Sequence, residues 1–573
     1  MSQPTQAPAT ITAGGAILAR LKVVGVDYIF ANSGTDFPPI IEGLAEASAK
    51  DIALPRAIVI PHEHAAMGMA HGYYLATGRA QAVMAHTNVG LANCAIGAIN
   101  AATEHVPVLL FSGRTPALEQ GRLGARTVPI GWGQEMRDQT ALVREATKWD
   151  YELRFPEQAL EVVDRAYAVA CSTPRGPVYV SLPREVLCGL CPSEALHEPS
   201  RMAPVQFGPT AAALEQAAAL LAGARNPVIV AQRGAGSAEG FSQLAALADD
   251  WGIPVVQYWA IQLAIATDHP MSVGTNPEPW IGEADVVLVL DCLAPWSPAA
   301  HKLAPGCKVI QAGPDPLYSR FPVRNFQADL SLAGETADII LGLARAMRPH
   351  LAARSDACAV RRADVAGRAG DIRGVVRRAA EKGGEGELMT KEWVSLCLSR
   401  AIEDREATVL SELGCPMDPM TLRAAESWYQ EPHSGGLGWS VPCALGMQLA
   451  QPERLIIATM GDGSYMFANP VACHQIAEAL NLPVLLLVLN NREWGAVRKS
   501  VLGTYPDGYA SRVNQMPLVS LDPTPDFTKV AAASRAWTAR VDGPGELAGV
   551  LAAAIEHVST TRTQALVEIR VAP

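Results

Sequence analysis

The sequence lacks an apolar run long enough to cross a membrane, and residues 1–15 lack the charged start and apolar core of a signal peptide. It also lacks an excess of basic residues. The formal net charge is −11, which argues against a nucleic-acid partner because binding to phosphates requires concentrated lysine and arginine. We therefore expect no membrane span, no signal peptide and no nucleic-acid partner.

Paired cysteine motifs are also scarce. The chain has 11 cysteines, an odd number scattered through apolar segments, which favours the reduced cytoplasm over an oxidising compartment. Cys188 and Cys191 form a CxxC without a second pair, so we expect neither a zinc site nor a redox site there.

The length of 573 residues exceeds what one hydrophobic core supports and predicts about three domains. Hydrophobic residues make up 49% and charged residues 18%, as is typical of a large, well-buried enzyme. Strand-like and helix-like segments alternate, which predicts an α/β protein of three doubly wound parallel-sheet domains. We assign them to residues 1–190, 205–345 and 386–573. Residues 350–385 are rich in Arg, Ala and Gly and predict a solvated linker with some helix.

The most informative stretch is 458–500. An apolar run leads into Gly461-Asp462-Gly463-Ser464, a helix-like segment follows, and a second apolar run ends at Asn490-Asn491. In a parallel sheet, polar groups at the carboxyl ends of strands bind ligands, and glycines let the backbone approach a phosphate. Asp462 is suited to hold a magnesium ion that also binds phosphate oxygens. A Gly-Asp-Gly by itself could equally be an ordinary turn.

A second polar segment follows the apolar run AIVI in the first block. His62, Glu63 and His64 open a helix-like segment there. No histidine stands three residues after Glu63, so this is not a zinc protease motif, and the two histidines have no convincing third metal ligand. The alternative interpretation of Glu63 is a surface glutamate at a helix start.

Together these motifs carry a resemblance. The Gly-Asp-Gly, the paired Asn just under thirty residues later, the segment EHAA and the run SGGLGWSVP resemble the thiamine diphosphate-dependent enzymes of the benzoylformate decarboxylase and acetolactate synthase-like family. The resemblance covers nearly the whole chain. It implies a pyrimidine-binding, a central and a diphosphate-binding domain, with thiamine diphosphate and Mg²⁺ as cofactors. It also implies a homodimer or homotetramer with active sites between subunits.

The resemblance further implies roles for individual residues. Glu63 would be catalytic, because a buried carboxyl group hydrogen-bonds the pyrimidine ring and favours the tautomer that removes the thiazolium C2 proton. Asp462, Asn491 and the Glu493 carbonyl would bind the metal, and Leu437 would hold the cofactor bent. The implied cofactor contacts are Gly414, Cys415, Leu437, Gly461, Asp462, Gly463, Ser464 and Asn491.

Other matching positions concern the substrate. His86 matches a histidine that relays protons in benzoylformate decarboxylase, a task suited to a pKa near neutrality. Its alternative is a structural histidine. Thr35 matches a serine that binds the substrate carboxylate, and Ala496 and Ser500, with their neighbours, match positions that shape the substrate pocket.

The implied activity is cleavage or formation of the C–C bond beside the carbonyl of a 2-oxo acid, by a decarboxylase or a carboligase. The second active-site histidine of benzoylformate decarboxylase has no clear match near Pro295-Trp296-Ser297, where His301 is displaced. Gly234 to Gly240 approach a dinucleotide fingerprint with the wrong spacing, and no FAD-contacting pattern is evident, so FAD is not expected. A 2-hydroxyacyl-CoA lyase, a diketone-cleaving hydrolase, a flavin-dependent oxidase and a non-catalytic cofactor binder remain alternatives.

Overall fold

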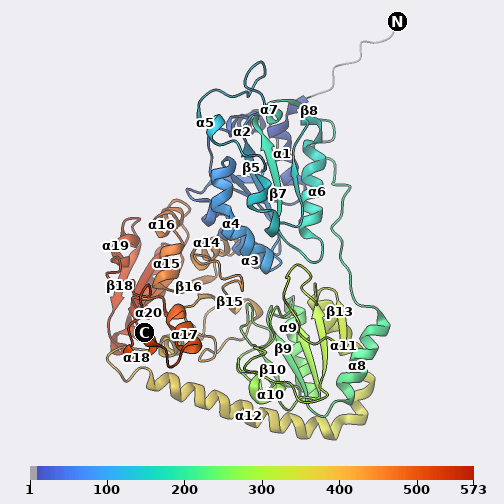
Figure 1. Cartoon of the computed structure of the whole chain (residues 1–573), viewed down its shortest axis with the longest axis vertical. Helices are drawn as coiled ribbons and strands as arrows, with labels where there is room; N and C mark the ends of the chain where they lie inside the picture. Colours follow the sequence, from blue (N-terminus) through green and yellow to red (C-terminus); the bar gives the residue numbers. More distant parts are fainter. Residues whose placement is uncertain (1–9) are drawn as a thin grey trace. The chain divides into compact units, whose positions relative to one another are not determined.

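A computed structural model describes residues 10–573 of the chain (Figure 1). The chain divides into two compact units. One comprises the described part of Met1–Val205 together with Pro432–Pro452, and the other comprises Gln206–Glu431 together with Glu453–Pro573. Each unit is described by itself below.

The first unit is built on a six-stranded parallel sheet. Its strands lie in the order β3-β2-β4-β5-β7-β6. The central strands are continuous apolar runs, as expected for a sheet covered on both faces. The strands are β2 (Tyr28–Ala31), β3 (Arg56–Val59), β4 (Gln81–Ala85), β5 (Val108–Arg114), β6 (Asp150–Glu152) and β7 (Val178–Pro183), with a separate antiparallel pair of β1 (Thr10–Thr12) and β8 (Leu190–Pro192).

Two groups of helices pack in this unit. Helix α1 contacts α2 and α6, whereas α3 contacts α4 and, most extensively, α14. The α3–α14 contact brings the far segment 432–452 into the first unit, and glycines let the two backbones approach closely. The helices are α1 (Ala13–Val23), α2 (Pro38–Ala49), α3 (Glu63–Thr77), α4 (Thr87–Thr103), α5 (Ile130–Gly133), α6 (Ala159–Cys171), α7 (Arg184–Leu187) and α14 (Ser440–Ala450).

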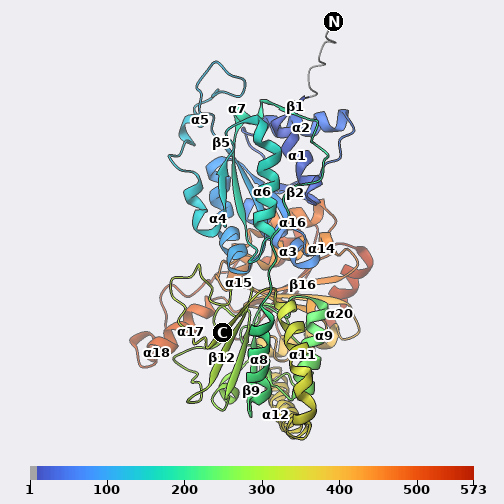
Figure 2. The same cartoon turned by 90° about the vertical axis from the view of Figure 1, so that its right-hand side faces the viewer.

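The second unit contains two parallel sheets. The five-stranded sheet has the order β10-β9-β11-β12-β13, and its helices α8 and α11 lie side by side (Figure 2). Its strands are β9 (Pro227–Ala231), β10 (Val255–Val256), β11 (Val286–Leu290), β12 (Lys308–Gly313) and β13 (Leu330–Ala333). Its helices are α8 (Ala211–Gly223), α9 (Ala238–Trp251), α10 (Glu278–Ile281) and α11 (Thr336–Leu351).

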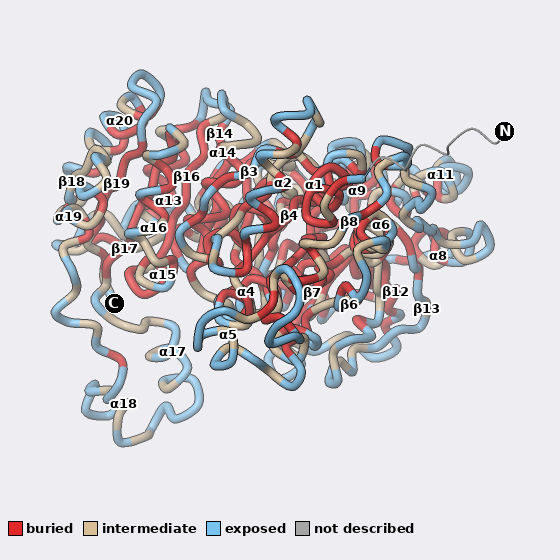
Figure 3. The backbone as a smooth tube through the Cα atoms, turned by 90° about the horizontal axis from the view of Figure 1, so that it is seen from above, coloured by how far each residue is buried: buried red, intermediate tan, exposed pale blue. Residues whose placement is uncertain are grey.

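The six-stranded sheet of the second unit has the order β15-β14-β16-β17-β19-β18. Its strands are β14 (Ala407–Glu412), β15 (Trp428–Gln430), β16 (Leu455–Gly461), β17 (Leu485–Asn490), β18 (Trp537–Val541) and β19 (Ala565–Arg570). Its helices are α13 (Lys391–Ala401), α15 (Asp462–Phe467), α16 (Pro470–Ala479), α17 (Gly495–Thr504), α18 (Tyr509–Val513), α19 (Phe527–Ala532) and α20 (Pro544–Thr561). The strands are largely buried, whereas α17 and α18 are mostly exposed (Figure 3).

The two six-stranded sheets share one topology. Counted along the chain, each has the strand order 2-1-3-4-6-5, with a reversal between its first and third strands. Ligands of open α/β sheets bind at the carboxyl ends of the strands beside such a reversal. The reversal lies between β2 and β4 in the first unit and between β14 and β16 in the second.

The predicted fold class is confirmed, since all three large sheets are parallel and carry helices. Residues 350–385, predicted as a solvated linker with some helix, are mostly helix: α12 (Ser355–Lys382) is one continuous helix of 28 residues, and most of its residues are exposed or half-buried. Its alanines and arginines have high helix propensity, and Cys358, Val365 and Ala369 pack into the core of the five-stranded sheet. Within residues 10–573, no helix combines the length and apolarity that crossing a membrane requires.

Candidate active site

The reversal of the first sheet gathers several polar side chains at the carboxyl ends of its strands. Asn32 and Asp36 follow β2, Glu63 follows β3, and His86 follows β4. Hydrogen bonds join the four residues in two pairs, Asn32 with Glu63 and Asp36 with His86. The sheet topology therefore places the two predicted catalytic residues, Glu63 and His86, at one edge.

Glu63 is the first residue of α3 and is buried, with 5% of its surface exposed. Its two carboxylate oxygens accept hydrogen bonds from side-chain amides, Oε1 from Asn32 Nδ2 at 3.0 Å and Oε2 from Asn93 Nδ2 at 2.9 Å. A Cβ on Gly90 would lie 2.8 Å from Oε1, so α4 passes directly beside the carboxylate. Glu63 is therefore not a surface glutamate.

His86 precedes α4 and contacts two side chains. Its Nδ1 is hydrogen-bonded to the Asp36 carboxylate, and its Nε2 lies 2.9 Å from Gln134 Nε2. The Asp36 hydrogen bond, together with the charge of Asp36, raises the pKa of His86, against the opposing effect of burial. Because Gln134 Nε2 is a donor, Nε2 of the neutral imidazole accepts and Nδ1 donates to Asp36. The imidazole therefore presents Nε2 as its proton acceptor.

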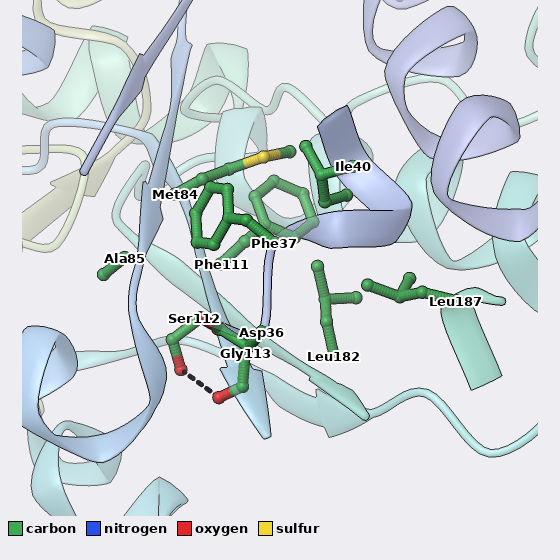
Figure 4. Close-up of a pocket in the computed structure, with 10 residues that line it drawn as sticks. All are labelled: Asp36, Phe37, Ile40, Met84, Ala85, Phe111, Ser112, Gly113, Leu182 and Leu187. Carbon is green, nitrogen blue, oxygen red and sulfur yellow. Dashed lines mark hydrogen bonds between the residues drawn. The ribbon is translucent and has the colours of Figure 1, made fainter. Parts of the chain in front are cut away.

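Asp36 is held by the start of α4 as well as by His86. Its Oδ2 accepts from the Thr87 N–H at 3.3 Å, and Gly113 packs against the carboxylate. Figure 4 shows a pocket that Asp36 helps to line, together with mostly apolar side chains such as Phe37 and Phe111. Its volume of about 10 Å³ admits about one water, so it is a gap in the packing and too small for a substrate.

Two more predicted residues belong to the first unit. Thr35 is exposed and lies next to Asp36, and its carbonyl accepts from Arg184 Nη1 at 3.1 Å. Leu437 is half-buried in the loop before α14. The carbonyls on either side of it, those of Gly436 and Gly438, accept hydrogen bonds from α4 and α3.

The remaining predicted residues lie at the reversal of the six-stranded sheet in the second unit. Gly414 and Cys415 follow β14, and the Cys415 N–H donates to Thr459 Oγ1 at 3.0 Å. A Cβ at Gly414 would lie 2.4 Å from the Thr459 carbonyl carbon, so only glycine fits beside β16. Asp462 begins α15 directly after β16, with Gly461 before it and Gly463 and Ser464 in the helix.

Asp462 is buried and has backbone partners. Its carboxylate accepts from the N–H of Gly463 at 3.0 Å and of Arg492 at 2.8 Å. Burial raises the pKa of Asp462, with these hydrogen bonds opposing the effect. In the loop that follows β17, Asn491 Oδ1 accepts from the Glu493 N–H at 3.2 Å.

The residues present fit a bound magnesium ion. No cluster of three or more His, Cys, Asp or Glu side chains with metal-binding geometry exists among residues 10–573, so a metal here must draw on amide and carbonyl oxygens. Asp462 after β16, together with Asn491 and the Glu493 carbonyl after the neighbouring strand β17, supplies such an oxygen set. A divalent cation would offset the charge of a carboxylate that has only backbone donors.

The two predicted substrate residues of α17 are exposed. Ala496 and Ser500 lie on its surface, and Trp494, just before the helix, covers Gly463. The predicted residues thus form two groups, one in each unit. The first group contains Thr35, Glu63, His86 and Leu437, and the second contains Gly414, Cys415, Gly461, Asp462, Gly463, Ser464, Asn491, Glu493, Ala496 and Ser500.

Sequence reasoning missed four polar side chains of the first group. Asn32 and Asp36 stand directly after β2, so the position of that strand at the reversal could have indicated them. Asn93 and Gln134 have no local signal, because Asn93 is mid-helix and Gln134 comes from a long connection. Conversely, the third glycine of the fingerprint-like segment, Gly240, packs against the Ala235 carbonyl, which supports its interpretation as strand–helix packing.

Three family models match the chain in order. The N-terminal TPP binding domain, the central domain and the C-terminal TPP binding domain of thiamine pyrophosphate enzymes match residues 11–142, 214–343 and 415–569.

Curated relatives and a solved structure agree with these matches. A probable 2-ketoarginine decarboxylase of Pseudomonas aeruginosa is 28% identical over 565 residues, covering 95% of this chain and 91% of the relative. An acetolactate synthase of Mycobacterium bovis is 25% identical, covering 91% and 82%. The structure of a 4-hydroxybenzoylformate decarboxylase of Rhodococcus jostii matches with a TM-score of 0.79 at 20% identity, covering 98% and 99%.

Proposed function

The chain belongs to the thiamine pyrophosphate enzyme family, and from this we propose that it is a thiamine diphosphate- and Mg²⁺-dependent decarboxylase or carboligase of 2-oxo acids. The observation that carries the proposal is Glu63. Its buried carboxylate is held by two amides at the reversal of the first sheet, which suits it to bind the ring nitrogen of the cofactor. The relatives, decarboxylases and an acetolactate synthase, agree with this class and do not favour a CoA lyase.

Bound thiamine diphosphate would supply a carbon nucleophile and an electron sink. Glu63 would orient the pyrimidine and exchange a proton with its ring nitrogen. Asn32 and Asn93 fix the carboxylate rotamer, so its position would not change when that proton moves.

His86 would transfer protons at Nε2. Asp36 holds Nδ1–H and favours the protonated ring, so Nε2 can accept a proton and later return it. Gln134, 2.9 Å from Nε2, and Thr35 would contact the substrate carboxylate, with Ala496 and Ser500 lining the rest of the pocket.

Magnesium would be bound by Asp462, Asn491 and the Glu493 carbonyl, and the diphosphate by Gly461, Gly463 and Ser464. Gly414 and Cys415 would contact the pyrimidine or diphosphate, and Leu437 would keep the cofactor bent. We assign residues 1–190 to pyrimidine binding, 205–345 to the central domain and 386–573 to diphosphate binding.

We propose that the enzyme is a homodimer or homotetramer with active sites between subunits. Support comes from α4, whose outward face exposes Val89 (50%), Ile96 (40%) and Ile99 (47%) at helical spacing. Asn93 of the same helix donates a hydrogen bond to Glu63. A second subunit that covered these three apolar side chains would therefore lie beside the catalytic carboxylate. The 11 free cysteines support a cytoplasmic location.

FAD is not part of the proposal. The reversal of the five-stranded sheet lies between β9 and β11. Side chains of residues that follow the strands of this sheet occupy the space at its carboxyl end. Tyr318 is buried, donates to Asp291 Oδ1 at 2.7 Å and is hydrogen-bonded by Arg233. A colourless purified protein would agree with this; a yellow one with a flavin spectrum would favour the oxidase alternative.

The proposal is tested with Glu63→Gln. We expect this variant to bind thiamine diphosphate within about tenfold of the wild type but to lose proton exchange at C2 of the bound cofactor, measured by deuterium incorporation and NMR. Glu185→Gln is the matched control, because Glu185 is buried in the same unit and bonded to the Ala117 N–H. Normal exchange in Glu63→Gln would remove Glu63 from the mechanism. A panel of 2-oxo acids, with and without an acceptor aldehyde, would then identify the substrate.

A further inference from the structure

The loop that carries Leu437 is fixed to the helices that carry the catalytic residues. Gly435 and Gly438 adopt positive φ angles of 67° and 83°, which turn the chain sharply on both sides of Leu437. A Cβ on Gly436 would lie 2.3 Å from Asn100 Oδ1. The loop backbone therefore rests directly on α4.

Asn100 joins two points of this loop. It is buried in α4, its Nδ2 donates to the Gly436 carbonyl at 2.9 Å, and its Oδ1 accepts from Ser434 Oγ at 2.6 Å. Directly after the end of α4, Glu104 Oε1 accepts from the His433 N–H at 2.9 Å. The first half of the loop is thus tied to α4 by side chains.

His64 holds the other half. It follows Glu63 in α3, is buried, and donates from Nε2 to the Gly438 carbonyl at 3.1 Å, with a further backbone hydrogen bond to Leu437. Burial lowers the pKa of His64, so the ring stays neutral and keeps its single N–H for the loop. Its Nδ1 has no hydrogen-bond partner in the described structure.

We infer that Asn100 and His64 are positioning residues that set the place of the Leu437 side chain. This inference rests on the proposed function, in which Leu437 supports the bent cofactor. The backbone is held on both sides of Leu437, and both anchors belong to helices that also contact Glu63: α3 begins with it and α4 supplies Asn93. The helices that carry and hold the catalytic carboxylate would then also fix the residue that supports the cofactor, and catalysis by positioning depends on such fixed geometry.

The test compares three variants of the full chain. His64→Phe and Asn100→Leu keep the approximate size of the side chain but remove the donor to the loop. His71→Phe is the matched control: His71 is a buried histidine of α3 whose ring contacts Trp439 of the same segment. His64→Gln serves as a rescue variant because its amide can donate to the Gly438 carbonyl.

Two measurements distinguish positioning from a general loss of stability. In the cofactor-free protein, hydrogen–deuterium exchange of residues 433–439 should be faster by about five- to thirtyfold in His64→Phe and Asn100→Leu, the effect of losing one buried hydrogen bond. Exchange should be unchanged in His71→Phe and partly restored in His64→Gln. With Mg²⁺ and thiamine diphosphate, C2 proton exchange should slow in the same two variants.

The outcomes separate the two proposals. Unchanged loop protection and C2 exchange in both His64→Phe and Asn100→Leu would overturn the inference while leaving the proposed function intact. If His64→Phe fails to fold, His64→Leu replaces it, since leucine also lacks a donor. If Asn100→Leu fails to fold, Asn100→Asp replaces it, since it loses the donor to Gly436 and keeps the acceptor for Ser434. If the wild type binds no thiamine diphosphate, the proposed function fails and with it the role of the loop.

Discussion

Glu431 provides a quantitative test of the electrostatics near the proposed cofactor site. It lies in the second unit, 9% exposed, beside Glu412, which is fully buried at the end of β14. The Glu431 carboxylate accepts from the Leu413 N–H at 3.3 Å. Burial, followed by the charge of Glu412, raises the pKa of Glu431 from 4.5 to about 8. Gly414 and Cys415, which follow Leu413 directly in the chain, are proposed cofactor contacts.

The sign of the pH effect follows from the raised pKa. Below about 4.5 Glu431 is protonated in both the folded and unfolded states and has no effect on the free energy of unfolding. Between about 4.5 and 8 only the unfolded state releases the proton, so stability falls as the pH rises, and above 8 the loss is complete. The difference of about 3.5 pKa units sets an upper limit of about 5 kcal/mol.

The assay is urea denaturation of the wild type and Glu431→Gln at pH 5, 7 and 9, followed by tryptophan fluorescence. The variant cannot ionise, so its stability relative to the wild type should rise by about 2–5 kcal/mol between pH 5 and pH 9. Glu453→Gln, whose carboxylate is 90% exposed, should show no such rise. If the free energies of unfolding of the wild type and Glu431→Gln differ by the same amount at all three pH values, Glu431 is not a buried neutral acid.

Three further predictions concern the site and its frame. Asp36→Asn should lower the pKa of His86 towards its ordinary value, which NMR of labelled histidine would measure. Because Asp36 raises that pKa, the free energy of unfolding should fall more at pH 6 than at pH 9 in this variant. A loss of stability that does not depend on pH would contradict this prediction. Gly72→Ala would place a methyl group 2.0 Å from a carbonyl oxygen of α14 and should cost about 1–3 kcal/mol in thermal unfolding, whereas Gly370→Ala on α12, with open space around it, should be neutral or stabilising. Asp462→Ala should weaken Mg²⁺-dependent binding of thiamine diphosphate by about a hundredfold or more, measured by fluorescence quenching, and tight binding in the presence of a chelator would refute the metal assignment.

Local patterns were sufficient to predict much of the fold. The two apolar runs on either side of Gly461–Ser464 form β16 and β17 as expected, because parallel strands buried on both faces leave little choice of residue type. Glu63 and Asp462 were found for a related reason: Asp462 directly follows β16, and Glu63 begins a helix a few residues after the apolar run of β3. The extent of helix at 350–385 was underestimated because a long helix that exposes most of its surface has a polar composition much like that of a linker.

Contacts between distant residues were beyond local patterns. Nothing near Gln134 or Asn93 indicates that they contact His86 and Glu63, because these pairs are set by the order of strands and the path of a long connection. The packing of α14 on α3 likewise joins segments almost four hundred residues apart, through glycines at 68, 72 and 446 that permit close backbone approach.

The sequence by itself determined the class of fold, the family resemblance and the residue types needed for a thiamine diphosphate and magnesium site, because those depend on strand composition and on short motifs. Only the tertiary structure decided which side chains hold Glu63, which tautomer Asp36 imposes on His86, and that Leu437 is anchored to α3 and α4. Each of these depends on hydrogen bonds between residues that only folding brings within 3 Å or so of one another. The residue types that the chemistry requires are therefore set by short local motifs, whereas the positions of these side chains relative to one another depend on the packing of the whole chain.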